Sequence, residues 1–301
     1  MTARTCPAYA PHDGFVAPAR PRRELWRLFV SGVLIVAIYL GLLFLFGLYL
    51  TQTYGRFIAE ALLQRMGRGD SPGVMVLLLW SFLGLAAGPI LAARLIHDRP
   101  AGTLFGPSPR RVLSDFFTVA LPVTGMHVLL LPLALASQDI RPGLNLAAFL
   151  SYLPFALPGL LIQTSAEEVL FRGYLQQQLA ARFAHPAIWM GVPSALFALG
   201  HYLPEDYGAN AWAVAAWAGM FGLLAADLTA RTGTLGAALG LHFANNVSSL
   251  LLVGIERNLD GLALWSRSID LADSDVLGPA LAVDFAVMVT SWLLARLVMR
   301  V

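Results

Sequence analysis

Long apolar runs separated by short polar connections dominate this chain. The runs cover residues 25–51, 73–96, 113–136, 146–166, 187–203, 211–229, 234–254 and 278–299. A helix needs about 20 such residues to cross the ~30 Å hydrocarbon core of a bilayer, and most of these runs have roughly that length. The pattern therefore predicts an all-α fold: a polytopic transmembrane helix bundle of about eight spans.

The first 24 residues do not share this pattern. They are rich in proline, alanine and arginine without periodicity, which predicts a disordered cytoplasmic tail over residues 1–24. The first apolar run is too long for the apolar region of a signal peptide and no small-residue cleavage site follows it, so we expect an uncleaved span. No linker or internal repeat divides residues 25–301, which we expect to form a single membrane domain.

Composition and charge agree with a membrane protein. Hydrophobic residues make up 57% of the chain and charged residues 13%. All 20 basic residues are arginines, and in a model with both termini inside, only six lie outside, namely Arg56, Arg65, Arg68, Arg141, Arg257 and Arg267. The remaining fourteen then lie on the cytoplasmic side, as the positive-inside rule expects. We expect a bacterial inner (plasma) membrane protein with cytoplasmic N- and C-termini; the dispersed arginines argue against a nucleic-acid partner.

Three ionisable side chains follow the fourth apolar run directly: Glu167, Glu168 and Arg172. A charge at membrane depth costs on the order of 2.5–3.5 kcal/mol on insertion scales, so it marks a functional site by default. On a helix, Glu168 and Arg172 are four residues apart and share one face, with the acid before the base. Glu167 is rotated by about 100° from that face. We therefore expect an ion pair between Glu168 and Arg172, and an unpaired Glu167.

Two further polar positions lie within apolar runs. His201 is near the end of the fifth run, and His242 and Asn246 lie inside the seventh. His242 and Asn246 are four residues apart and share one helical face, which must look into the bundle because lipid offers no hydrogen-bond partners. Glu167, His201, His242 and Asn246 are therefore expected to line one shared cavity.

This set of side chains is suited to hydrolysis. An unpaired carboxylate beside imidazoles can accept a proton from water, and an imidazole or amide can stabilise an oxyanion. Glu167, His201 and His242 also match the oxygen and nitrogen ligands of a divalent metal such as zinc. The two roles compete for Glu167. We favour Glu167 as the base, and the residues alone leave the requirement for metal open.

The motifs resemble those of a known family. Glu-Glu-x-x-x-Arg at 167–172, Phe-x-x-x-His at 197–201 and His-x-x-x-Asn at 242–246 are similar to the three motifs of the CAAX protease and bacteriocin-processing (CPBP, or Abi) family, over about residues 146–254. The resemblance implies an intramembrane endopeptidase of the glutamate-dependent type, with or without metal. By motif position, the catalytic residues would be Glu167, His201, His242 and Asn246, supported by Glu168 and Arg172.

We therefore expect the chain to hydrolyse a peptide bond in a membrane-associated polypeptide, such as a prenylated CAAX-type protein, at the lipid bilayer. Two alternatives stay open: a transporter with a proton relay, and a non-catalytic membrane scaffold of the same fold. A transporter predicts internal symmetry and broken helices, which the sequence lacks. A scaffold has no need of Glu167, His201, His242 and Asn246, all of which are present.

Overall fold

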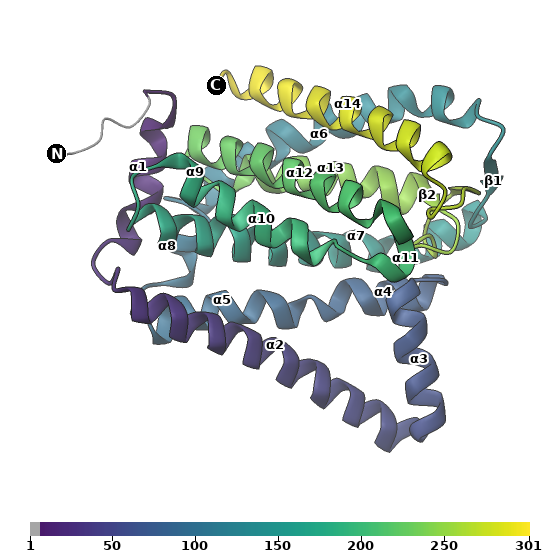
Figure 1. Cartoon of the computed structure of the whole chain (residues 1–301), viewed down its shortest axis with the longest axis horizontal. Helices are drawn as coiled ribbons and strands as arrows, with labels where there is room; N and C mark the ends of the chain where they lie inside the picture. The colour runs from purple at the N-terminus through teal and green to yellow at the C-terminus, as the bar shows by residue number, and fades with distance from the viewer. Residues whose placement is uncertain (1–6) are drawn as a thin grey trace.

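The computed structural model describes residues 7–301 as a bundle of antiparallel helices (Figure 1). The helices that cross the bundle are α2 (Leu25–Tyr54), α4 and α5 (Pro72–Ser81 and Leu83–Leu95), α6 (Pro109–Leu135), α7 with η4 and α8 (Leu146–Glu168, Val169–Gln176 and Gln177–Ala180), α9 and α10 (Pro186–Trp189 and Gly191–Gly200), α12 (Ala211–Thr232), α13 with η6 (Gly236–Val247 and Ser248–Leu252) and α14 (Ser274–Met299). Successive crossings run in opposite directions. The short segments η3 (Ala101–Leu104), α11 (Pro204–Tyr207) and η5 (Gly208–Asn210) lie between crossings.

These crossings match the predicted spans, and the chain is an integral membrane protein. Within residues 7–301, six helical segments are long and apolar enough to cross a membrane, and the segment Pro186–Gly200 is a shorter apolar helix. The outer surface of the bundle is apolar: Phe29, Phe44 and Leu129 are each more than 70% exposed. Large apolar side chains on the outside of a helix bundle are suited to lipid, whereas they would be costly in water.

Glycines allow the helices to approach closely. A Cβ atom at Gly240 of α13 would lie 2.6 Å from the carbonyl oxygen of Phe116 on α6. At Gly88 of α5, a Cβ would lie 3.2 Å from the Cα of Ile35 on α2. Small residues at such positions let transmembrane helices pack backbone to backbone. The α6–α13 contact lies at the centre of the bundle and holds α13, the helix that carries His242.

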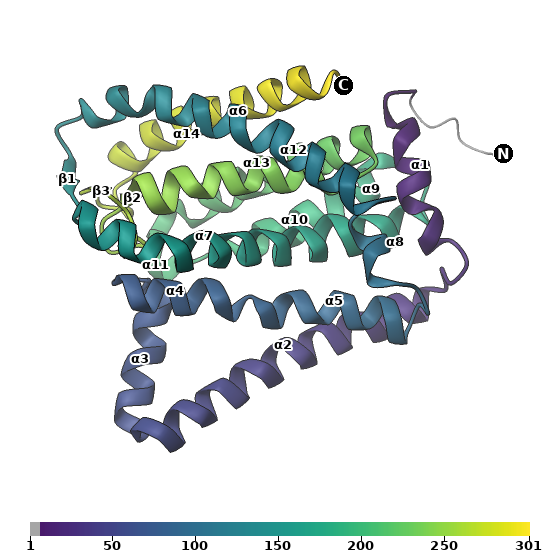
Figure 2. The ribbon, with the colours of Figure 1, turned by 180° about the vertical axis from the view of Figure 1, so that it is seen from behind.

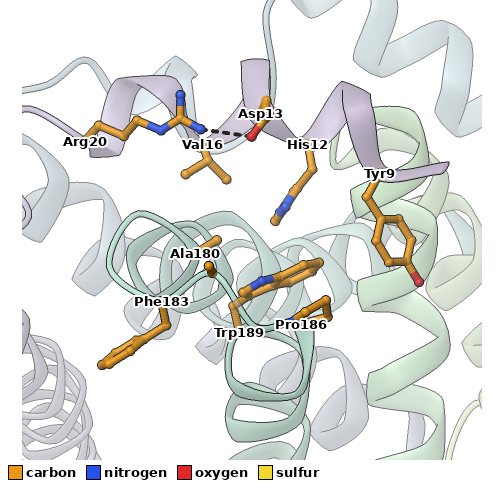
Figure 3. A pocket seen from close by; sticks show the side chains of 10 residues that line it. Tyr9, His12, Asp13, Val16, Arg20, Ala180, Phe183, Pro186 and Trp189 are labelled. Atoms are coloured by element: carbon orange, nitrogen blue, oxygen red, sulfur yellow. Dashed lines mark hydrogen bonds and ion pairs between the residues drawn. The ribbon is translucent and has the colours of Figure 1, made fainter. Parts of the chain in front are cut away.

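The N-terminal segment is ordered over its described part, which differs from the disordered tail predicted for residues 1–24. Residues 7–19 form η1 (Pro7–Tyr9), α1 (Ala10–Val16) and η2 (Ala17–Ala19), and residues 1–6 lie outside the described residues. Phe15, Val16 and Ala19 are buried, and His12 stacks on Trp189 with 4.4 Å between ring centroids. Figure 3 shows the cavity of about 90 Å³ beneath α1 into which His12 points. The few apolar side chains of the segment are enough to dock it on the bundle.

The opposite end of the bundle carries a small sheet that the sequence did not predict. Strands β1 (Ile140–Pro142), β2 (Val253–Ile255) and β3 (Trp265–Arg267) pair in the order β1-β3-β2, with β1 antiparallel and β2 parallel to β3. Strands of three residues are too short to show the alternation of apolar and polar residues by which a sequence indicates a strand. Helix α3 (Arg56–Arg68) lies at the same end and joins α2 to α4 (Figure 2).

Helix α7 starts at a side-chain cap and continues further than its apolar run. The Asn145 side chain accepts a hydrogen bond from the Ala148 backbone N–H at 2.9 Å. The helix continues without a break through η4, a π-helix, and α8 to Ala180. Glu167 and Glu168 therefore lie inside a long transmembrane helix rather than at its end. π-Helical turns are rare and are frequently found at functional sites.

Candidate active site

The ion pair predicted from helical spacing is present and buried. Arg172 Nη1 donates to Glu168 Oε1 at 2.9 Å, and the side chains are 1% and 0% exposed. The Arg172 guanidinium also lies over the Phe197 ring, 5.0 Å from its centroid, and Phe171 and Phe221 approach it at 5.8 and 6.0 Å. Aromatic faces attract a cation most strongly where water is excluded. The pair thus joins η4 to α10 and α12.

His242 connects the two adjacent glutamates. Its Nδ1 lies 2.8 Å from Glu168 Oε1, and because a carboxylate paired with arginine only accepts, Nδ1 carries the proton and donates it. His242 Nε2 lies 3.5 Å from Glu167 Oε2. Glu168 therefore fixes the ring and its tautomer, as a carboxylate does for many catalytic histidines. The other ring nitrogen of His242 faces Glu167.

Glu167 is the more accessible of the two acids. Its side chain is 13% exposed, whereas that of Glu168 is fully buried. A neutral His242 Nε2 and an ionised Glu167 are both acceptors, so a proton or a water molecule between them would satisfy both. Among the described residues, Glu167 is thus a carboxylate with an imidazole nitrogen 3.5 Å away and no ion pair with an arginine.

His201 is held near this pair by Phe197. Its Nδ1 lies 2.9 Å from the Phe197 carbonyl oxygen, which can only accept, so Nδ1 donates and Nε2 is left for another partner. The Phe197 ring lies 4.4 Å from the His201 ring and 6.3 Å from the His242 ring, between centroids. Among the described residues, no hydrogen bond or ion pair joins His201 to Glu167 or His242. His201 thus belongs to the same neighbourhood without touching the acid.

Asn246 has a partner that the sequence analysis missed. Its Nδ2 donates to Gln163 Oε1 at 2.9 Å, and Gln163 is 8% exposed. Gln163 lies four residues before Glu167 on α7, so the spacing rule that grouped His242 with Asn246 also groups Gln163 with Glu167. We did not single out Gln163 because glutamine carries no charge.

The expected metal ligands are not gathered into a metal site. Within residues 7–301, no three His, Cys, Asp or Glu side chains come close enough together to hold a metal ion. The Nδ1 atoms of His201 and His242 are both hydrogen bonded, and in the part of the chain that the structure describes, His242 Nε2 is the one imidazole nitrogen with a contact to Glu167. These donors do not fit a zinc site in this arrangement, and metal binding stays a prediction of the sequence.

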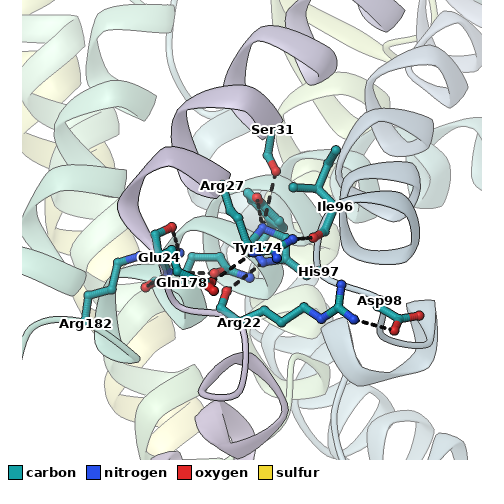
Figure 4. A network of polar contacts seen from close by, with 10 residues as sticks. All are labelled: Arg22, Glu24, Arg27, Ser31, Ile96, His97, Asp98, Tyr174, Gln178 and Arg182. Carbon is teal, nitrogen blue, oxygen red and sulfur yellow. Dashed lines mark hydrogen bonds and ion pairs between the residues drawn. The ribbon is translucent and has the colours of Figure 1, made fainter.

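A second polar network anchors η4 at the end of the bundle that holds α1 (Figure 4). The Tyr174 hydroxyl lies 2.9 Å from His97 Nε2, and His97 Nδ1 lies 3.1 Å from the Arg22 carbonyl oxygen. Nδ1 therefore donates to the carbonyl and Nε2 accepts from Tyr174. Burial lowers the pKa of His97 to about 4, so the ring is neutral near pH 7. Tyr174 lies two residues after Arg172, and this network fixes the continuation of the helix that carries both glutamates.

Comparison with known proteins identifies the segment that contains the site. Residues 149–248 match the family model described as "Type II CAAX prenyl endopeptidase Rce1-like". The chain is also 27% identical over 266 residues to the uncharacterized protein YyaK of Bacillus subtilis (strain 168), covering 83% of this chain and 85% of that one. No solved structure matches the chain significantly. The matched segment contains Glu167, Arg172, His201, His242 and Asn246, so the part of this integral membrane protein that holds the site is similar to the Rce1-like CAAX prenyl endopeptidases.

Proposed function

We propose that this protein is an intramembrane endopeptidase in which Glu167 activates water. The observation that carries the proposal is the different environment of the two adjacent acids. Glu168 is buried and held by Arg172 and His242, whereas Glu167 is partly exposed and faces His242 Nε2. One acid thus serves the structure, and the other is available for proton transfer.

The reaction follows from these positions. Glu167 accepts a proton from a water molecule as the water oxygen bonds to the carbonyl carbon of a substrate peptide. The carbonyl oxygen becomes an oxyanion, which an N–H of Asn246 or His201 Nε2, when protonated, stabilises. Glu167 then returns the proton to the departing amine as the C–N bond breaks, which leaves a carboxylic acid and an amine. A site that excludes most water strengthens each of these electrostatic contributions.

An apolar groove supports a substrate that is tethered to the membrane. A cavity of about 350 Å³ lies between α2 and the α4–α5 crossing, and Tyr39, Leu42, Phe46 and Trp80 are among the side chains that line it. A lipid chain on a substrate would find an apolar surface there. We propose lipidated or membrane-anchored polypeptides as substrates, cleaved on the cytoplasmic side of a bacterial inner membrane.

The experiment compares purified wild-type protein with Glu167→Gln in detergent. Quenched fluorescent peptides with and without a C-terminal isoprenoid are the substrates, and Glu60→Gln on α3 is the matched control because Glu60 is an exposed acid paired with Arg56. We expect wild-type and Glu60→Gln to cleave the lipidated peptide, and Glu167→Gln to lose the activity. A chelator arm tests the expected divalent metal separately. Equal cleavage by Glu167→Gln and wild type would refute the proposal.

A further inference from the structure

Two pairs of polar side chains face each other across the contact between α7 and α13. On α7, Gln163 and Glu167 are one helical turn apart, and on α13, His242 and Asn246 are one turn apart. The two helices run in opposite directions (Figure 1). Gln163 meets Asn246 at 2.9 Å, and Glu167 meets His242 at 3.5 Å. The four side chains thus form two adjacent cross-helix pairs, of which only the second contains an acid.

The first pair controls the orientation of the Asn246 amide. Asn246 Nδ2 carries two N–H groups, and one is donated to Gln163 Oε1. Because the amide is planar, fixing one N–H fixes the direction of the other. Among residues 7–301, the Asn246 side chain forms a hydrogen bond with Gln163 and with no other residue. Without that acceptor, the Asn246 amide could rotate.

The spacing connects this amide to the reaction. Four helical residues rise by about 6 Å, so the Gln163–Asn246 pair lies about 6 Å along the helix from the Glu167–His242 pair. The amide of Asn246 is therefore about one helical turn from a peptide carbonyl attacked by water at Glu167. A donor that is already oriented stabilises an oxyanion without reorganisation during the reaction.

We propose that Gln163 is a positioning residue of the hydrolytic site, which holds the Asn246 amide so that its second N–H meets the oxyanion. This inference rests on the function proposed above. Gln163 does not touch the reacting atoms and acts through Asn246. Its burial at membrane depth is otherwise costly, because a polar amide there needs a partner.

The test is a double-mutant cycle on the cleavage rate. Gln163→Met keeps the length of the side chain and removes the acceptor, and we expect kcat to fall by about tenfold with KM unchanged. Asn246→Ala should lower kcat by about 10²-fold or more, the usual cost of one oxyanion donor. The double variant should match Asn246→Ala alone, because Gln163 has no effect once the amide is absent.

Two further variants keep the test independent of folding. Thr164→Val is the matched control, since the buried Thr164 hydroxyl bonds only within its own helix, to the Leu160 and Leu161 carbonyl oxygens, and kcat should be unchanged. Gln163→Asn keeps an amide but is too short to reach Asn246, and it should lose activity as Gln163→Met does. If cleavage depends on Glu167, two results would overturn the inference. One is a wild-type kcat in a folded Gln163→Met or Gln163→Asn protein. The other is a double variant in which the two losses of kcat multiply. Cleavage that does not depend on Glu167 would instead overturn the proposed function.

Discussion

Removing Arg172 should destabilise the protein more than any comparable change at the surface. The change considered is Arg172→Met, which keeps much of the side-chain volume and removes the charge. Glu168 would then be a fully buried carboxylate with His242 Nδ1 as its remaining donor. Among residues 7–301, its Oε2 atom has no hydrogen-bond partner even in the intact pair. Breaking a buried ion pair from one side usually costs about 3–5 kcal/mol, and we expect about 3 because His242 still donates.

The companion change distinguishes lost attraction from a stranded charge. In Glu168→Gln/Arg172→Met neither charge remains, and a glutamine at that position can still accept from His242 Nδ1. Replacing both members of a buried pair is often close to neutral, so the double variant should be more stable than Arg172→Met by about 2 kcal/mol. The Arg56–Glu60 pair on α3 has the same four-residue spacing but is exposed. Arg56→Met should leave the free energy of unfolding unchanged.

The assay is denaturant unfolding in detergent micelles, followed by the fluorescence of the protein's seven tryptophans. The free energies of wild-type, Arg172→Met, Glu168→Gln/Arg172→Met and Arg56→Met are compared under one condition. The reasoning is refuted if Arg172→Met unfolds as wild type does, or if the double variant is less stable than Arg172→Met.

Two other predictions concern packing and pH. Gly240→Ala would bring a Cβ within 2.6 Å of the Phe116 carbonyl oxygen and should lower the free energy of unfolding by about 1–3 kcal/mol in the same assay. Gly125→Ala has open space beside it and should leave the free energy of unfolding unchanged. Equal stabilities of the two variants would contradict the close packing of α6 and α13. Burial lowers the pKa of His12 to about 4 from 6.5, and its Nε2 lies 3.2 Å from the donor Gln176 Nε2. The docking of α1 should therefore be fully present above pH 6.5 and weaken as the pH falls toward 4, by up to about 3 kcal/mol. Hydrogen exchange of residues 10–16 measures the stability of this docking. A His12→Gln variant with the same pH dependence as wild type would contradict the role of His12.

The part of the site that follows from local spacing could be predicted from the sequence. The Glu168–Arg172 pair depends only on a four-residue separation along one helix, and so does the shared face of His242 and Asn246. The spans were predictable for the same reason, because their length and apolar character are set by the bilayer. These features do not require knowledge of which helices are neighbours.

The part that depends on helix–helix register could not be predicted in this way. Which atom of His242 meets which glutamate, and that Gln163 meets Asn246, are set by how α7 packs against α13. The π-helical turns after Glu168 likewise have no signature in the pattern of apolar residues. The helices formed by residues 7–19 were not predicted because the composition of this segment indicates disorder, whereas its Phe15 and Val16 are buried against the bundle.

The different roles of the two adjacent glutamates are tested by comparing Glu167→Gln with Glu168→Gln in stability and kcat. We expect Glu167→Gln to unfold as wild type does but to lose kcat by about 10²–10⁴-fold, the usual contribution of a general base. Glu168→Gln should instead lower stability, because the buried Arg172 loses its carboxylate. A folded Glu167→Gln protein that cleaves the lipidated peptide at the wild-type rate would show that Glu167 is not the base.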